Sequence, residues 1–229
     1  MSTTSSTPCS ISSTNTPVRH VARRSFDVVA ALTGLLVLSP LLVLISIAVA
    51  ATSRGPVLFR QWRVGRHGIP FQILKFRTMR QDAERLGGQL TYGRDPRITR
   101  FGAILRATKL DELPQLANVV RGDMAIVGPR PEVPRYVELY TERQRRVLDV
   151  LPGITDPASI HYRNEAELLD ESDDPEATYV DVIMPHKLEL NLTYLERRTF
   201  WSDLGVIAAT LARLFRAPAR AHHHEIETR

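Results

Sequence analysis

Cysteine is almost absent from this chain of 229 residues, and acidic side chains are almost absent from its first third. The single cysteine, Cys9, excludes an intramolecular disulfide and a cysteine-based metal cluster. Residues 1–80 contain ten lysines and arginines but only one acid, Asp27. The formal net charge of +5 is therefore concentrated near the N-terminus, where it favours an anionic partner.

Aromatic residues are also scarce, at 7% of the chain. The basic stretch has no aromatic-interleaved platform and no recognition motif for nucleic acid, so no nucleic-acid partner is expected. Its positive charge flanks an apolar segment, which is typical of proteins that contact anionic lipid headgroups. The sequence therefore predicts a membrane partner.

Charged residues are missing altogether from Val28 to Ser53, a run of 26 residues rich in leucine, valine, alanine and isoleucine. Such a run exceeds the roughly 18 residues that mark a candidate membrane segment. It is too long, and begins too late, for a cleavable signal peptide. We therefore predict a membrane-associated segment over residues 19–54.

Ser39 and Pro40 divide this run near its middle, where proline removes a backbone donor and kinks or breaks a helix. Each half then reaches less than about 20 Å, whereas the hydrocarbon core is about 30 Å thick. Arginines flank the run on both sides, which favours both ends in the cytoplasm. A re-entrant hairpin is predicted, with a plain spanning helix as the alternative. Arg24 and Asp27, one turn apart, are a candidate surface salt bridge or interfacial anchor.

The remaining sequence predicts a helix-rich α+β catalytic domain over residues 55–216. Apolar segments around a turn-rich Gly65–Gly68 predict a β-hairpin between Gly55 and Met79. Helical spacing predicts a short helix over 100–109 and later helices over 135–150, 179–194 and 201–215. The first of these later helices is amphipathic and suits the protein surface or the membrane interface. The apolar stripe of the last one suits packing on the core or the membrane interface.

Three polar stretches receive no catalytic role. Residues 1–18, rich in serine and threonine, are predicted to be a disordered tail, and residues 217–229 a polar tail. Eight acids without a lysine or arginine lie between Glu165 and Asp181, which predicts a solvated helix or loop and not a metal site. His222 to His224 form at most a weak, adventitious metal binder.

The segment from Thr108 to Pro131, TKLDELPQLANVVRGDMAIVGPRP, gathers the residues that suggest chemistry. Asp111 and Glu112 precede a short predicted helix over 114–121, whose unpaired N–H groups favour anions and could also receive a phosphate. Carboxylates and phosphate at one site need a cation, and Mg²⁺ typically takes one or two carboxylates plus substrate phosphates. Arg130, between two prolines, offers a planar fork for phosphate.

Each part alone also has a simpler interpretation. Acidic residues ahead of a helix usually only cap it, and a Pro-Arg-Pro is often a rigid surface turn. The combination, however, resembles the core of the bacterial sugar transferases known as monotopic phosphoglycosyl transferases. Their pattern of L-D-E-L-P-Q-L, N-V, R-G-D-M and V-G-P-R-P is matched here by Leu110 to Leu116, Asn118-Val119, Arg121 to Met124 and Val127 to Pro131.

The resemblance assigns roles to further residues. It implies that Ser39-Pro40 breaks a re-entrant membrane helix. It makes Lys75 and Arg77, in the sequence KFRTM, candidate phosphate ligands, and Arg163 a candidate nucleotide contact. Arg106 would offset the diphosphate or orient the acidic pair, with a generic helix-surface arginine as the alternative. After Thr155 the chain departs from the family's usual continuation, G-x-x-Q-V.

The implied reaction transfers a phosphosugar from a UDP-sugar to polyprenyl (undecaprenyl) phosphate, giving polyprenyl diphosphosugar and UMP. This is the initiating step of bacterial polysaccharide or glycoconjugate synthesis. Asp111 would be the nucleophile that forms a covalent aspartyl phosphosugar, and Asp111 and Glu112 are the candidate Mg²⁺ ligands. Lys75, Arg106 and Arg130 would balance phosphate charge. The expected location is the bacterial inner membrane, with the catalytic domain in the cytoplasm.

Two other classes of function fit parts of the pattern. A membrane-anchored phosphohydrolase acting on nucleotide sugars could use the same acid, metal and arginines, and would release sugar phosphate to water. A non-enzymatic membrane scaffold would tolerate loss of the acidic pair. The sequence names neither the sugar nor the pathway, and it is compatible with a homo-oligomer without requiring one.

Overall fold

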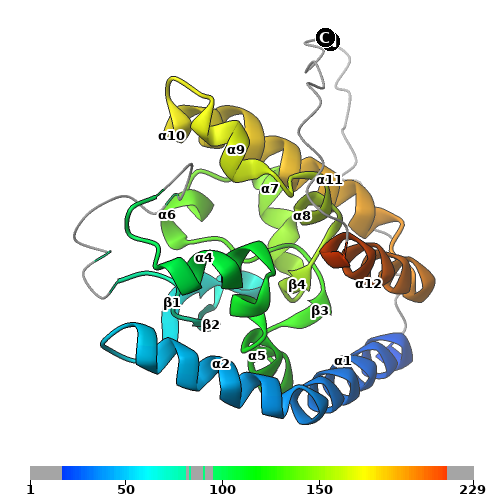
Figure 1. Cartoon of the computed structure of the whole chain (residues 1–229). Helices are drawn as coiled ribbons and strands as arrows, with labels where there is room; N and C mark the ends of the chain where they lie inside the picture. Colours follow the sequence, from blue (N-terminus) through cyan, green and yellow to red (C-terminus); the bar gives the residue numbers. More distant parts are fainter. Residues whose placement is uncertain (1–16, 81–82, 84–89, 91–94, 216–229) are drawn as a thin grey trace, which may run out of the picture.

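The computed structural model describes residues 17–80, 83, 90 and 95–215. Of the two predicted tails, residues 217–229 lie outside this part of the chain, as do residues 1–16 of the first tail. The described chain is rich in helices and has two small two-stranded sheets, which confirms the predicted helix-rich α+β class. A bent pair of helices forms its base, and the C-terminal helices lie above (Figure 1).

The base consists of two successive helices, α1 (Pro17–Val37) and α2 (Ser39–Thr52), whose axes are bent by 62°. Pro40 lies in the first turn of α2, where backbone N–H groups have no partner inside the helix. Its missing N–H therefore costs no hydrogen bond within α2. Ser39 Oγ donates to the Leu36 carbonyl at 2.7 Å and satisfies an oxygen at the end of α1. The helix break predicted at Ser39-Pro40 is confirmed.

The two helices of the base differ from the pair they form in whether they could cross a membrane. In the described part of the chain, no single helix is both long enough and apolar enough to cross a membrane. The bent pair reaches those limits of length and composition when its two halves are counted together.

The β-hairpin predicted between Gly55 and Met79 is confirmed as antiparallel strands β1 (Leu58–Val64) and β2 (Pro70–Phe76). Leu58 lies opposite Phe76 and Val64 lies opposite Pro70. Strand β2 packs onto both base helices through two apolar clusters. Their buried members include Phe71, Ile73 and Ala31 in one cluster, and Phe76, Ile45 and Val49 in the other.

The acidic pair lies on a 3₁₀ turn, η2 (Leu110–Glu112), between helices α4 (Arg100–Ala107) and α5 (Gln115–Arg121). Thr99 Oγ1 caps α4 by accepting from the Gly102 N–H at 2.9 Å. Gly122 ends α5 with a φ of 101°, a left-handed conformation that suits glycine. Both helices were predicted, so the local setting of the acidic pair follows from its sequence.

Strands β3 (Ala125–Val127) and β4 (Gly153–Thr155) pair in parallel just beyond α5. Their backbones approach so closely that a Cβ on Gly153 would lie 2.1 Å from the Gly128 nitrogen. Glycine is therefore required at this contact, which fixes the chain immediately before Arg130.

The single amphipathic helix predicted over 135–150 is wrong. The segment instead forms α6 (Pro134–Val137), α7 (Glu142–Arg145) and the 3₁₀ turn η3 (Arg146–Asp149). Thr141 restarts the helix because it forms a reciprocal capping box with Gln144. Of the apolar side chains on which that helix was predicted, Tyr136, Tyr140 and Val147 are buried in the protein core, whereas Leu139 is 53% exposed.

The C-terminal part folds over this core as a series of helices. The acidic stretch 165–181 is helical and mostly solvated, as predicted, and the helix expected over 179–194 begins with a π-helical turn. The elements in order are α8 (Pro157–His161), α9 (Glu165–Asp170), α10 (Pro175–Thr178), the π-helix η4 (Tyr179–Ile183), α11 (Met184–Glu196) and α12 (Phe200–Phe215).

Helix α1 is fastened directly to the backbone around the acidic motif. The Arg24 guanidinium donates to the Val119 carbonyl at 2.6 Å and to the Met124 carbonyl at 3.2 Å, at the end of α5 and just before β3. Asp27 accepts from the Ile126 N–H at 3.3 Å and is only 6% exposed. The surface position expected for this pair is therefore wrong, because both side chains satisfy backbone groups at the interface between α1 and the domain.

Two glycines in helices provide a test of this packing. We expect Gly102→Ala to lower the free energy of unfolding by roughly 2 to 3 kcal/mol, because its Cβ would lie 2.0 Å from the Thr78 carbonyl oxygen. Gly205→Ala, in α12, meets nothing within 4 Å and should raise stability by roughly 0.5 to 1 kcal/mol. Unfolding of the two detergent-solubilised variants measures both changes, and equal shifts would contradict the close contact between α4 and Thr78.

Candidate functional site

The two acidic side chains of the η2 turn face different surroundings. The turn follows Lys109, whose φ of 58° reverses the chain between α4 and α5. Asp111 is buried, with 6% of the residue exposed, and the Glu112 side chain is 12% exposed. Neighbouring carboxylates held in this way can have very different acidities.

Glu112 is held by two cations from separate elements. Lys75 Nζ, from β2, lies 3.1 Å from Glu112 Oε1. Arg130, from the loop after β3, reaches both Glu112 oxygens with its two terminal nitrogens, and its Nη1 lies 3.1 Å from Oε2. The structure thus brings together three of the predicted site residues, and this fork uses both oxygens of Glu112.

The electrostatic surroundings push the acidities of the two carboxyl groups apart. Burial favours the neutral form of Glu112, but Arg130 and Lys75 outweigh it and hold the pKa of Glu112 well below its usual range. Burial and the nearby negative charge of Glu112 raise the pKa of Asp111. Burial lowers the pKa of Lys75 to about 8, although Glu112 opposes the shift. Glu112 is therefore the fixed anion, and Asp111 is the more basic carboxylate.

Asp111 also retains an open oxygen. Its Oδ1 is buried and has no hydrogen-bond partner among the described residues. The same is true of both side-chain amide atoms of Gln115, a fully buried residue one helical turn further on. Leaving a buried polar group unpaired costs about 1 to 3 kcal/mol, so these atoms suit a ligand that would pair with them. Gln115 was not predicted as a site residue, although it lies inside the L-D-E-L-P-Q-L motif.

The sequence is similar to a known protein family over most of its length. The family model of the bacterial sugar transferases matches residues 18–217. The chain belongs to the bacterial sugar transferase family. The resemblance inferred from the acidic motif is therefore confirmed. The match takes in the α1–α2 pair, the β-hairpin, the acidic pair and the C-terminal helices.

Individual relatives of this sugar transferase differ in how much of their length it spans. An uncharacterized sugar transferase EpsL of Bacillus subtilis is 37% identical over 85% of this chain and 87% of its own length. The UDP-glucose:undecaprenyl-phosphate glucose-1-phosphate transferase of Escherichia coli is 36% identical over 86% of this chain but 41% of its own length. An enzyme of the same name from Caulobacter vibrioides is 38% identical, over 84% of this chain and 69% of its own length.

Two further predicted cations lie in other contacts. Arg106 donates from Nε to Thr78 Oγ1 at 2.9 Å, and its positive charge partly opposes the rise in the pKa of Asp111. Arg77 is buried and its guanidinium binds Ser53 and the Pro56 carbonyl, where it ties the end of α2 to β1. These contacts connect Arg77 to the end of α2, and its role as a phosphate ligand stays a prediction.

The remaining sequence assignments of site residues stay predictions. Arg163 lies in the turn between α8 and α9 with a half-buried side chain, and its nucleotide contact is untested. His222 to His224 lie outside the described residues. The described part of the chain contains no group of three or more histidine, cysteine or acidic side chains arranged to hold a metal ion. That finding leaves a Mg²⁺ site open, because Mg²⁺ takes few carboxylates when substrate phosphates complete its shell.

The low pKa of Lys75 is directly testable. The rate at which an amine-reactive reagent labels Lys75 should reach half its maximum near pH 8, because burial disfavours the ammonium. Peptide mass spectrometry in Mg²⁺-free buffer measures this rate, with the exposed Lys109 reporting on the labelling chemistry. Glu112→Gln should move the midpoint lower still, since it removes the carboxylate that supports the charge. A midpoint near the ordinary lysine value of about 10.4 would contradict the buried setting.

Proposed function

We propose that this chain transfers a phosphosugar from a UDP-sugar to polyprenyl (undecaprenyl) phosphate, giving polyprenyl diphosphosugar and UMP. This would initiate the synthesis of a bacterial polysaccharide or glycoconjugate. The observation that carries the proposal is the unequal acidic pair, in which Glu112 anchors two cations and Asp111 keeps a buried, open oxygen. The names of the Escherichia coli and Caulobacter relatives describe the same class of reaction.

In the first step, Asp111 attacks the phosphorus that carries the sugar. A bond forms between a carboxylate oxygen and that phosphorus, and the bond to the bridging oxygen of the diphosphate breaks. UMP leaves with the bridging oxygen, and a covalent aspartyl phosphosugar remains. Asp111 suits this role better than Glu112, because its raised pKa makes a more basic nucleophile and its Oδ1 is not bound to a cation.

In the second step, an oxygen of polyprenyl phosphate attacks the same phosphorus. The bond to Asp111 breaks, which regenerates the carboxylate and releases polyprenyl diphosphosugar. Dividing the transfer into two steps avoids bringing two anionic substrates together at once. Lys75 and Arg130 can move part of their hydrogen bonding from Glu112 to the phosphates, and Arg106 adds positive charge beside Asp111.

The residues present fit a Mg²⁺ ion in part. Asp111 Oδ1 is an unpartnered carboxylate oxygen, whereas both Glu112 oxygens hold cations. Glu112 could serve as a second ligand once the donor phosphates attract Lys75 and Arg130. A Mg²⁺ ion held by Glu112 and by one oxygen of Asp111, with the other oxygen free to attack, would offset the charge of the diphosphate.

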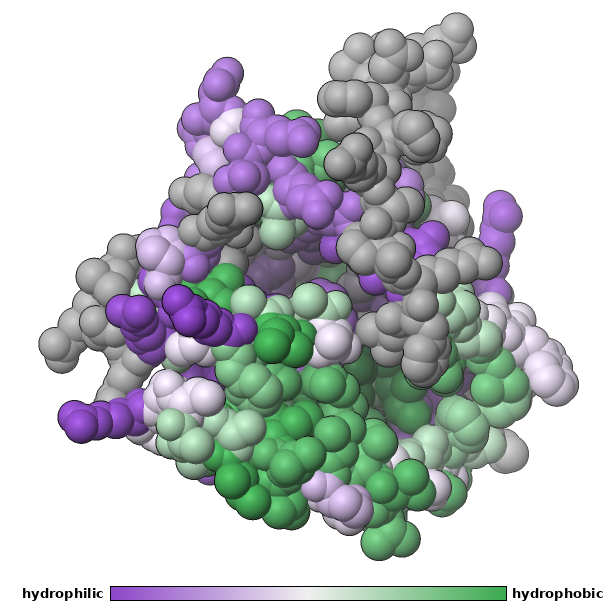
Figure 2. Space-filling model, viewed as in Figure 1, coloured by the Kyte–Doolittle hydropathy of each residue, from purple (hydrophilic) through white to green (hydrophobic). Residues whose placement is uncertain are grey.

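The base of the molecule suits the location of the acceptor. Apolar side chains gather over the lower face of the molecule in Figure 2, where α1 and α2 lie, and hydrophilic ones lie toward the opposite end. We infer that α1 and α2 form a re-entrant hairpin in the cytoplasmic leaflet of the inner membrane, with the catalytic domain in the cytoplasm. Its exposed apolar residues are Val21, Val29, Leu32, Leu36, Val37, Val43, Leu44 and Ile47.

A phosphohydrolase acting on nucleotide sugars is the main competing function. Incubation of the full-length protein in polyprenyl-phosphate vesicles with a panel of UDP-sugars separates the two, with UMP and the lipid product measured together. The transferase forms lipid diphosphosugar in step with UMP. Release of free sugar phosphate without lipid product would favour the hydrolase, and the absence of turnover with every donor would favour a membrane scaffold.

The acidic pair should respond unequally to loss of charge. Asp111→Asn should abolish UMP release and transfer, because an amide cannot replace the carboxylate nucleophile. Glu112→Gln should lower both but recover in part at high Mg²⁺ concentration, because it weakens binding of the ion without removing the nucleophile. Steady-state UMP release across a Mg²⁺ titration compares the two variants. Full activity of Asp111→Asn would rule out its assignment as nucleophile.

Re-entrant topology predicts that both ends of the α1–α2 pair face the cytoplasm. Single cysteines, His20→Cys or Arg60→Cys in a Cys9→Ser background, should both resist an impermeant maleimide in intact spheroplasts and react after lysis. Labelling of one position from outside would contradict the hairpin. Replacing Ser39 and Pro40 by leucine should restore a continuous helix and expose one of the two positions.

A further inference from the structure

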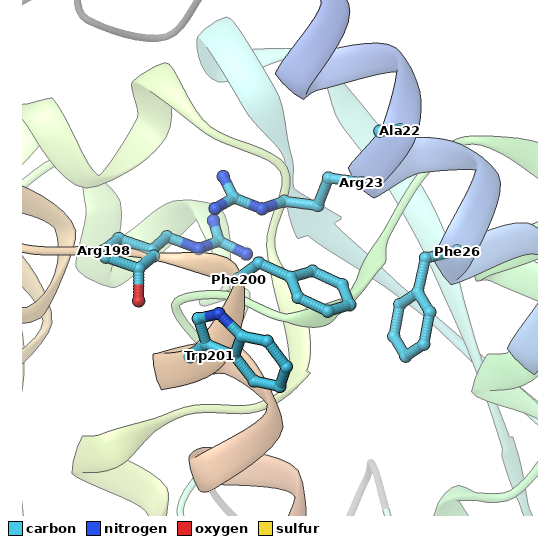
Figure 3. A pocket seen from close by; sticks show the side chains of 7 residues that line it. Ala22, Arg23, Phe26, Arg198, Phe200 and Trp201 are labelled. Atoms are coloured by element: carbon cyan, nitrogen blue, oxygen red, sulfur yellow. The ribbon is translucent and has the colours of Figure 1, made fainter.

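A cavity lies away from the acidic pair, between the N-terminal parts of α1 and α12. It has a volume of about 580 Å³. Figure 3 shows Phe26 of α1 facing Phe200 and Trp201 of α12, with the Arg23 and Arg198 guanidinium groups close together beside them. The cavity therefore combines an aromatic wall with two positive charges.

The two arginines share one carboxylate. Arg23 Nε lies 3.0 Å from Asp203 Oδ2, and Arg198 Nε lies 2.8 Å from Asp203 Oδ1. Tyr194 also donates to Asp203, so the oxygens of this carboxylate are fully engaged. Two guanidinium charges thus face one negative charge, which leaves an excess of one positive charge. The side chains of Arg23, Arg198 and Asp203 are 18%, 10% and 7% exposed. That excess suits one further anion.

The nearest additional charges do not remove this excess. Asp27 and Arg24, on the same helix, carry opposite charges and are bound to the backbone of β3 and of the end of α5. The cluster of five charged side chains therefore still has one net positive charge. Within the described contacts, the terminal nitrogens of Arg23 have no assigned acceptor, so they can donate to a phosphate.

The position of the cavity along α1 points to a lipid phosphate. Arg23 and Phe26 immediately precede Val28, where the uncharged run of the hairpin begins. This places them at the depth of the headgroups if the hairpin lies in the membrane. Trp201 is 77% exposed, and its ring and that of Phe26 flank Phe200 at centroid distances of 5.9 and 5.4 Å. Exposed tryptophan next to arginine is typical of the interface between lipid and water.

We propose that this cavity binds the phosphate of an anionic phospholipid, with the glycerol and upper acyl chain against the three aromatic rings. The inference rests on the proposed membrane placement of the α1–α2 pair. It assigns the cavity to a resident lipid and not to the polyprenyl phosphate acceptor, because Arg23 and Arg198 bind Asp203 and neither touches Asp111 or Glu112. Bound lipid would hold α12 against α1 and fix the height of the catalytic domain above the bilayer.

The chain allows a direct fluorescence test, because it has only two tryptophans. In a Trp62→Phe background, Trp201 is the sole emitter, and Trp62 lies on β1 away from the cavity. The full-length protein is placed in phosphatidylcholine nanodiscs that contain increasing fractions of either brominated phosphatidylglycerol or brominated phosphatidylcholine. Bromine on the upper acyl chain quenches a tryptophan that it contacts.

Brominated phosphatidylglycerol should quench Trp201 at a roughly fivefold lower mole fraction than brominated phosphatidylcholine, the preference expected of about one basic side chain. Arg23→Gln should remove this difference, and Arg23→Lys should retain part of it. Arg54→Gln is the matched control, since it removes one exposed charge beside the same apolar helices but outside the cavity, and it should retain the difference. Arg198 is left unchanged because it also holds the Val127 carbonyl.

Three results would overturn the proposal. Equal quenching by the two lipids, or no quenching by either, would show that the cavity does not select an anionic lipid. An equal effect of Arg54→Gln and Arg23→Gln would assign the preference to general surface charge. Relief of quenching by trace polyprenyl phosphate would assign the cavity to the acceptor. UMP release measured in the same nanodiscs separates each of these results from a failure of the proposed transferase activity.

Discussion

The ion pair between the Glu112 carboxylate and two cations is the interaction on which the site depends. It joins β2 through Lys75, the η2 turn through Glu112 and the loop after β3 through Arg130. Removing one partner of a buried ion pair typically costs about 3 to 5 kcal/mol, because a charge is left without compensation. Glu112 therefore fixes the relative positions of three chain segments, and its negative charge contributes to the raised pKa of Asp111 beside it.

A second set of contacts connects this site to the apolar base. Asn118, fully buried in α5, accepts from the Leu74 N–H at 3.0 Å and donates to the Gln72 carbonyl at 2.8 Å, so α5 is fixed to β2. Arg24 binds the Val119 carbonyl in the same part of α5, and Asp27 binds β3. The turn that carries Asp111 is thus held by a helix that is itself fastened to α1. In the proposed membrane setting, this arrangement would set the height of Asp111 relative to the lipid acceptor.

Much of the fold could be predicted because its signals are local. Proline fixed the break at Ser39-Pro40, alternating apolar residues and a glycine-rich turn gave the β-hairpin, and Gly122 marked the end of α5. The prediction over 135–150 was wrong because several of its apolar residues pack into a core with helices that are distant in sequence, and because Thr141 starts a new helix. Helical periodicity alone does not distinguish a core-facing stripe from an interfacial one.

The residues of the site could be predicted from the sequence, but the contacts that each of them makes could not. Lys75, Glu112 and Arg130 were all candidates, yet which cation binds which oxygen depends on contacts 37 and 18 residues apart in sequence. Arg77 was predicted to bind phosphate from the resemblance of KFRTM to the family, and its contacts with Ser53 and the Pro56 carbonyl, more than 20 residues away in sequence, could not be read from that short motif. Gln115 was overlooked because only its burial without a partner distinguishes it from an ordinary residue of a helix.

Asp111, with its open oxygen, is the proposed nucleophile of a two-step transfer. The most direct measurement is mass spectrometry of the full-length protein after incubation with UDP-sugar and Mg²⁺ in the absence of polyprenyl phosphate. We expect a phosphosugar adduct on the peptide that contains Asp111, and we expect it to disappear when polyprenyl phosphate is added. An adduct on another residue, or transfer to the lipid without any adduct when donor is saturating, would contradict it and favour direct attack by the lipid phosphate.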